Sequence, residues 1–260
     1  MVIKKKDLKE MLFVDIETVS EQPAYDQVPG ELRAVWAKKA ARLLRIPDGE
    51  ELAHTDIAAA YDDKAGIFAE FAKVACITVG YLTKVKRGQQ PILRIKTFAG
   101  HDEGAVLGDF CKLMDQHFDD PTSNYLCGHN IKEFDVPFLC RRLVIHGMRL
   151  PRLLNIAGKK PWQVQHLVDT MVLWRFGDYK NYTSLALLAA TLRIPSPKDD
   201  IDGSQVGSVY WKDDDLDRIV TYCEKDVITV AQIAMRYAGA PLIPADKIEI
   251  IHPEIRKRDE

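Results

Sequence analysis

Residues 10–19 read Glu-Met-Leu-Phe-Val-Asp-Ile-Glu-Thr-Val and constrain the fold more than any other stretch of the chain. Every second residue in the middle of this stretch is aliphatic, namely Leu12, Val14 and Ile16. A two-residue period is typical of a β-strand, and it places Asp15 and Glu17 together on the opposite face. Two carboxylates about 4 Å apart repel each other by roughly 1 kcal/mol in water and about 4 kcal/mol in a protein-like dielectric.

Two interpretations of this acidic pair are open from the strand alone. A divalent cation can neutralise both carboxylates, and oxygen ligands without a His or Cys beside them favour Mg²⁺ or Mn²⁺. Alternatively, the strand lies at the edge of a sheet and water solvates its acidic face. Because charged residues are rarely buried without a partner, the first interpretation predicts a functional site.

The composition places few limits on what the chain does. It has 260 residues, 47% of them apolar, and a formal net charge of −2, so any nucleic-acid contact must come from local basic patches. No Gly-, Pro- or Ser-rich linker divides it, and we expect a single domain over 1–260. No stretch approaches the roughly 20 apolar residues of a membrane span, so we expect no membrane partner. The five cysteines are scattered, which predicts buried thiols in a reducing cytoplasm.

The hydrophobic periodicity predicts an α/β protein with a mixed sheet covered by helices on both faces. Further strands are predicted at 74–81, 92–98 and 124–127, and helices at 31–44, 102–118, 135–146, 171–176, 184–192 and 216–237. In the first helix, one apolar stripe is expected to pack inward, formed by Leu32, Val35, Trp36, Ala40, Leu43 and Leu44.

Two more carboxylates are candidates for the same site. Asp135 starts a predicted helix, where the helix dipole holds a carboxylate ionised; an ordinary acidic cap is the alternative. Asp226 lies four residues after Tyr222 on the last long helix, so both side chains share one face at the margin of its core stripe. From there Asp226 can reach inward to the strand, or it can be a solvated surface residue.

Together, and in this order, the segments resemble the three motifs of the DEDD 3′–5′ exonucleases. The motifs are Asp15-Ile16-Glu17-Thr18, Asn130 followed by Phe134-Asp135, and Tyr222 followed by Asp226. The Tyr-x-x-x-Asp spacing resembles the tyrosine (DEDDy) subclass. The sequence Phe-Asp-Val-Pro-Phe-Leu at 134–139 is similar to a motif of the proofreading domain of family B DNA polymerases. More narrowly, the chain resembles the stand-alone predicted exonucleases related to that domain. The resemblance is weakest over a helical insertion at about 25–63.

The resemblance implies an RNase H-like fold and hydrolysis supported by two divalent metal ions, Mg²⁺ or Mn²⁺. It implies that the metal ligands and catalytic carboxylates are Asp15, Glu17, Asp135 and Asp226. It further implies that Tyr222 orients the attacking water. The implied substrate-binding residues are Thr18, Asn130 and Phe134, the last as a base-stacking surface, although core packing explains Phe134 equally well.

The implied substrate is the 3′ end of single-stranded DNA, and protein partners are left open. An RNA-directed 3′–5′ exonuclease is also compatible with the motifs, because that choice depends on how the pocket treats a 2′-hydroxyl. The rival classes are a non-catalytic nucleic-acid-binding module of the same fold and an RNase H-like endonuclease or integrase that cuts within a strand. The second rival usually has a different carboxylate spacing and lacks Tyr-x-x-x-Asp. The module would have lost one of the carboxylates, whereas this chain keeps all four and the tyrosine. For Asp169 we expect a helix N-cap.

Overall fold

The computed structural model describes residues 3–47, 49–83, 90–180, 182–195, 200–253 and 255. These residues form a mixed six-stranded sheet in the order β5-β4-β1-β2-β3-β6. The strands are β1 (Met11–Ser20), β2 (Ala72–Leu82), β3 (Leu93–Ala99), β4 (Tyr125–Gly128), β5 (Leu167–Asp169) and β6 (Ile248–Ile251). The pairs β1–β2 and β2–β3 are antiparallel, while β1–β4, β4–β5 and β3–β6 are parallel.

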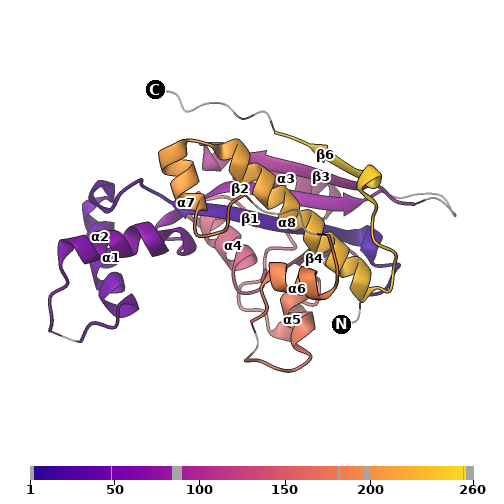
Figure 1. Ribbon diagram of the computed structural model, residues 1–260, viewed down its shortest axis with the longest axis horizontal. Coiled ribbons are helices and arrows are strands. Elements are labelled where there is room, and N and C mark those ends of the chain that lie inside the picture. The colour runs from indigo at the N-terminus through magenta and orange to yellow at the C-terminus, as the bar shows by residue number, and fades with distance from the viewer. Residues whose placement is uncertain are drawn as a thin grey trace.

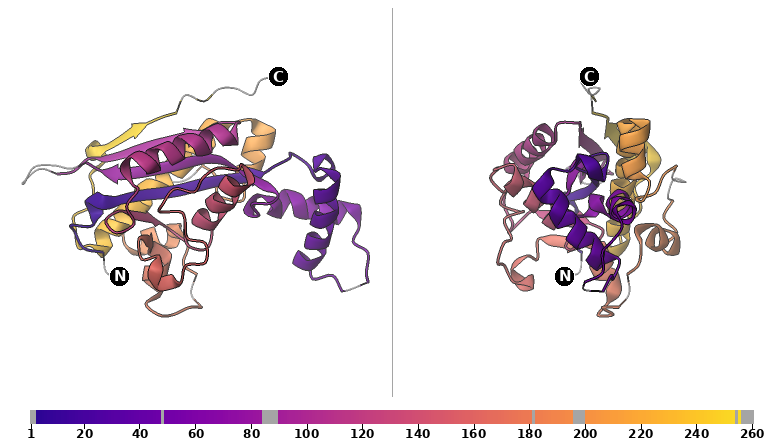
Figure 2. Two further views of the ribbon diagram at one scale, coloured as in Figure 1. Left: turned by 180° about the vertical axis from the view of Figure 1, so that it is seen from behind. Right: turned by 90° about the vertical axis from the view of Figure 1, so that its left-hand side faces the viewer.

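Helices cover both faces of this sheet, as predicted, and Figures 1 and 2 show α8 on one face and α3 on the other. The main helices are α3 (Glu103–His117), α4 (Asp135–Ile145), α5 (Thr170–Arg175), α6 (Leu185–Thr191) and α8 (Leu216–Tyr237). Shorter helical pieces are α7 (Val206–Ser208), the π-helical turn η5 (Val209–Asp213) and the 3₁₀ turns η1 (Leu8–Glu10), η2 (Tyr25–Gln27), η3 (Ala65–Ile67), η4 (Pro161–Gln163) and η6 (Ala245–Lys247). Side chains cap several starts: Asp102 accepts the Ala105 N–H of α3 at 3.1 Å.

Strand β1 lies in the middle of the sheet, so the edge-strand interpretation of the acidic pair is wrong. Leu12, Val14 and Ile16 are buried in the core formed with α3 and α4, as the alternation predicts. The opposite face of β1 packs on α8 and carries Asp15 and Glu17. A β-bulge follows directly, because Glu17 pairs with Cys76 whereas Thr18 pairs with Val74. Such bulges re-aim neighbouring side chains.

The short strand β4 leaves half of one edge of β1 open. It pairs with β1 only along Met11, Leu12 and Phe13, and the chain then turns away at Gly128. A Cβ on Gly128 would lie 2.8 Å from the Val14 carbonyl oxygen and 1.9 Å from a methyl group of Ile131. Only glycine fits this close approach, and it lets the next segment turn beside the open edge of β1.

The expected insertion contains two helices, α1 (Gly30–Leu43) and α2 (His54–Lys64), at one end of the molecule beyond the end of β1 (Figures 1 and 2). They share a small aromatic core, in which the ring centroid of Trp36 lies 5.2 Å from that of Tyr61 and 5.0 Å from that of Phe71. The prediction that all six apolar residues of α1 pack inward is wrong for four of them. Trp36 and Ala40 are buried, but Leu32, Val35, Leu43 and Leu44 are exposed because α2 covers only a narrow face of α1.

Candidate active site

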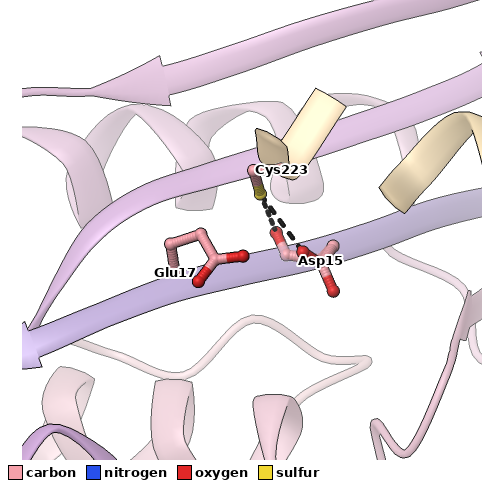
Figure 3. Close-up of side chains that lie close together, drawn as sticks. All are labelled: Asp15, Glu17 and Cys223. Carbon is pink, nitrogen blue, oxygen red and sulfur yellow. Dashed lines mark hydrogen bonds between the residues drawn. The ribbon is translucent and has the colours of Figure 1, made fainter. Parts of the chain in front are cut away.

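Asp15 and Glu17 lie on the α8 face of β1, opposite Thr78 and Cys76 of β2. Figure 3 shows them with Cys223 of α8, and ligand atoms of the three side chains all lie within 4.8 Å of one another. The Cys223 thiol donates to the Asp15 carboxylate at 3.3 Å and approaches the Asp15 carbonyl oxygen at 3.5 Å. The motifs did not single out Cys223, whose periodicity on the last predicted helix indicates only a core position. Its place directly after Tyr222 and three residues before Asp226 could have indicated that it lies beside the acidic pair.

Asp135, which lies on α4, approaches the acidic pair of β1 from the side opposite α8. It begins α4, is only 3% exposed, and lies beside the backbone N–H groups of its own residue and of Ile16, which act to lower its pKa. Ile16 lies on the part of β1 that β4 no longer covers. Asp135 is therefore more than an acidic cap, since it lies beside the strand that carries the acidic pair.

Tyr222 and Asp226 lie one turn apart on α8, and both are partly exposed. The charge of Asp226 raises the pKa of Asp15, Glu17 and Asp135, so its carboxylate lies within electrostatic reach of the other three. This interaction favours the inward interpretation of Asp226, although its side chain is also partly exposed. The carboxylates of the three motifs thus lie in one region of the structure.

Burial and mutual repulsion oppose ionisation of this cluster. The largest cause is burial of the carboxylates, followed for Asp15 by the charges of Asp135 and Asp226; together they hold the pKa of Asp15 and of Glu17 well above the usual range. Burial is also the largest cause that raises the pKa of Asp135, to about 7, and the charge of Asp169 adds to it more than that of Asp226. Burial thus outweighs the helix start, and the expectation that this position holds Asp135 ionised is wrong. Ionising the metal-free cluster costs more than ionising the same carboxyl groups in water.

The donor set fits a divalent cation. Among the described residues, no Lys or Arg forms an ion pair with Asp15, Glu17 or Asp135, so no protein cation offsets their charge. Carboxylate oxygens are the ligands that Mg²⁺ and Mn²⁺ prefer. The expectation that no Cys lies beside them is wrong, because the Cys223 thiol is close to both Asp15 and Glu17. Burial raises the pKa of this thiol, so it disfavours the thiolate that would bind a metal. His129 and His166 do not join the cluster: the first bonds to Thr170 and Thr183, and the second to the Leu153 carbonyl.

A cleft of about 480 Å³ opens beside the cluster and runs along the end of β1. Its lining includes Glu17, Thr18 and Phe134, so two of the three expected substrate-binding residues border it. The helical insertion and the segment around α7 supply other walls, including Asp62, Asp63, Gly66, Ile67, Trp211 and Lys212. The Thr18 hydroxyl donates to the Gly66 carbonyl at 2.7 Å, which ties the end of β1 to the insertion. Phe134 lines the cleft and also packs on the core, with its ring 5.6 Å from that of Phe138.

Asn130 is held in an unusual conformation. Its backbone is left-handed, with φ of 65°, and its side-chain oxygen is buried without a hydrogen-bond partner among the described residues. A buried amide oxygen without a partner costs about 1–3 kcal/mol, so a ligand that donates to it would recover that energy. This geometry suits the substrate-binding role expected for Asn130.

Asp169 maintains this turn. Its buried carboxylate caps α5 through the N–H groups of Met171 and Val172, as expected, and also accepts the N–H groups of Asn130 at 3.0 Å and Lys132 at 3.1 Å. One oxygen serves three of these donors, while the other serves Lys132 alone. Asp169 therefore holds the segment between Gly128 and Asp135 as well as capping a helix.

A family model matches residues 68–239, and its description is "Predicted 3'-5' exonuclease related to the exonuclease domain of PolB". The chain belongs to this family. The match includes Asp135, Tyr222 and Asp226 but begins after β1, so the assignment of Asp15 and Glu17 depends on the structure and the motif. None of the described helices of this predicted exonuclease combines the length and apolar character that a membrane span requires.

The structure is similar to that of the family B DNA polymerase from the hyperthermophilic archaeon Pyrobaculum calidifontis, with a TM-score of 0.51 and 17% sequence identity. The similarity covers 87% of this chain and 24% of the polymerase, so the exonuclease chain spans about a quarter of that protein. It confirms the RNase H-like arrangement of a mixed sheet between helices. No curated protein matches the chain.

Asp169→Asn tests whether this carboxylate positions the site. An asparagine retains one oxygen for three of the donors but turns an N–H₂ group toward Lys132, so the turn should shift while the helix cap survives. We expect the rate of 3′-end hydrolysis at saturating Mg²⁺ to fall roughly ten- to a hundredfold, the size of a misplacement effect. Asp102→Asn, a cap change on α3, is the matched control and should leave the rate unchanged. Equal rates for both variants and wild type would refute the positioning role.

Metal-free protein should lose stability as the pH rises through the acidic range. The pKa of Asp135 is about 7 in the folded chain, against an ordinary value of 3.8. Between these values the native state binds more protons than the unfolded chain, so the free energy of unfolding falls with rising pH, by an amount of the order of a few kcal/mol. Urea unfolding of wild type and Asp135→Asn between pH 4 and 8 isolates this group. The stability advantage of wild type should shrink up to about pH 7 and then level off; a constant difference would contradict the shift.

Proposed function

We propose that this protein is a metal-dependent 3′–5′ exonuclease that removes mononucleotides from the 3′ end of single-stranded nucleic acid. The observation that carries the proposal is the convergence of four carboxylates from three separate elements beside an open cleft. Ionising several carboxylates close together is unfavourable, and bound cations would offset that cost. DNA is favoured over RNA through the similarity to a DNA polymerase.

In this proposal Asp15, Glu17, Asp135 and Asp226 hold two divalent ions, Mg²⁺ or Mn²⁺. When bound, such ions supply positive charge that stabilises the charge developing on phosphate and leaving oxygens, and they acidify the attacking water. Asp135 lies at the start of α4, beside the Ile16 backbone of β1. Tyr222 orients the attacking water through its hydroxyl, one turn from Asp226.

The cleft holds the terminal nucleotide in this proposal. Phe134 offers a ring on which the base stacks, and the backbone around Thr18 is fixed by the bond to Gly66. Asn130 offers its unpaired oxygen to a sugar or base donor. We further propose that residues 1–260 act as one exonuclease unit, with the insertion as a wall of the cleft. The five free thiols suit a reducing, cytoplasmic compartment.

The deciding assay uses a 5′-labelled single strand of DNA and a copy whose 3′ end is blocked. Wild type should shorten the open strand one nucleotide at a time with Mg²⁺ or Mn²⁺, and should do nothing in chelator. The blocked copy should survive, whereas an endonuclease would cut both. A matched RNA strand ranks the two substrates.

Two substitutions assign the roles. Asp226→Asn should nearly abolish turnover because it removes charge from the metal site, while Tyr222→Phe should lower it by about a hundred- to ten-thousandfold, as for loss of a group that positions a proton. Wild-type turnover in Tyr222→Phe would refute its role. Failure of wild type to shorten either strand under any metal would favour the non-catalytic binding module.

A further inference from the structure

The loop between α5 and α6 carries the three most exposed aromatic side chains of the described residues. Phe176 is 84% exposed, Tyr179 is 81% exposed and Tyr182 is 67% exposed. In Figure 1 this loop lies below α5 and α6, at the lower edge of the molecule. Large exposed aromatic groups of this kind are typical of interaction sites rather than of solvated loops.

Phe176 is unfavourable for the stability of the folded chain in two ways. Its ring lies in water, so the chain lacks the stabilisation that burying a phenylalanine would give. Its backbone is also left-handed, with φ of 45° and ψ of 33°, at the end of α5, where glycine or asparagine is the usual residue. Neither cost is offset by contacts of the ring within the described chain, so the side chain is well placed for a ligand.

The base of this loop is attached to the segment that leads into the carboxylate site. Arg175 lies 3.3 Å from a carboxylate oxygen of Glu133, and its guanidinium stands 4.5 Å from the centre of the Tyr182 ring. At the other end, His129 and the Thr183 carbonyl lie 2.9 Å apart. The loop therefore borders the turn that carries Asn130 and leads to Asp135.

We propose that Phe176 and Tyr179 form a stacking platform for unpaired bases of the nucleic-acid strand whose 3′ end occupies the carboxylate site. This inference rests on the proposed function and specifies its substrate as a single strand several nucleotides long. Every base offers a flat face, and a base stacks on an aromatic side chain whatever the sequence. The exposed Lys180 adds a positive charge that suits the phosphate backbone. Paired bases in a duplex hide their faces, so the platform selects unpaired strands.

The test compares two double variants that differ only in ring content. Phe176→Leu with Tyr179→Leu keeps apolar side chains but removes both rings, whereas Phe176→Tyr with Tyr179→Phe keeps both. Fluorescence anisotropy with a labelled 20-nucleotide DNA strand, in chelator to prevent hydrolysis, measures the Kd. We expect the leucine variant to bind at least tenfold more weakly than wild type, and the aromatic variant to bind within about threefold of it.

Hydrolysis provides a second readout. A nitrophenyl ester of thymidine monophosphate carries only the terminal base and none that could stack on the loop. The ratio of the rate on the long strand to the rate on the ester should therefore fall at least tenfold in the leucine variant. Wild-type binding by the leucine variant would refute the platform, as would a loss of self-association in that variant with DNA binding unchanged. If wild type hydrolyses neither substrate, the proposed function fails, while the anisotropy comparison still decides the platform.

Discussion

Repulsion between like charges at the middle of β1 is the constraint on which the rest of this structure depends. Asp15 and Glu17 project from a central strand, Asp135 approaches across its open edge, and Asp226 approaches from α8. Burial strengthens the repulsion and raises the pKa of the first three carboxyl groups. Packing elsewhere must hold these groups together against a force that separates them.

Several local features around the cluster serve that purpose. The bulge after Glu17 changes the register of β1 against β2, and Gly128 lets the chain turn close to Val14. Asp169 then holds the turn with four backbone hydrogen bonds and keeps Asn130 in its left-handed conformation. Strained backbone and unpaired buried polar atoms are common at ligand-binding sites, because the surrounding packing is strong enough to hold residues in unfavourable conformations there.

Much of this arrangement follows from the sequence. Strict alternation predicts the acidic face of β1, and helical periodicity predicts α8 with its bounds, because long periodic segments carry strong local signals. The strands β5 and β6 were not predicted, since three or four residues show no period. Sequence reasoning also could not predict the approach of Asp135 to Ile16 or the exposure of Val35. The first depends on where β4 ends, and the second on how narrowly α2 covers α1.

Thermal melts of wild type and Asp15→Asn, each in chelator and in Mg²⁺, test the central claim most directly. If the four carboxylates form an empty cation site, Asp15→Asn should melt at or above the wild-type Tm in chelator, because it removes one repelling charge. Wild type should gain about 1.4 kcal/mol, a few degrees in Tm, when free Mg²⁺ is at about ten times its Kd, and the variant should lose most of that gain. A Tm for Asp15→Asn far below wild type in chelator would instead show that Asp15 is a structural carboxylate, and would contradict the account.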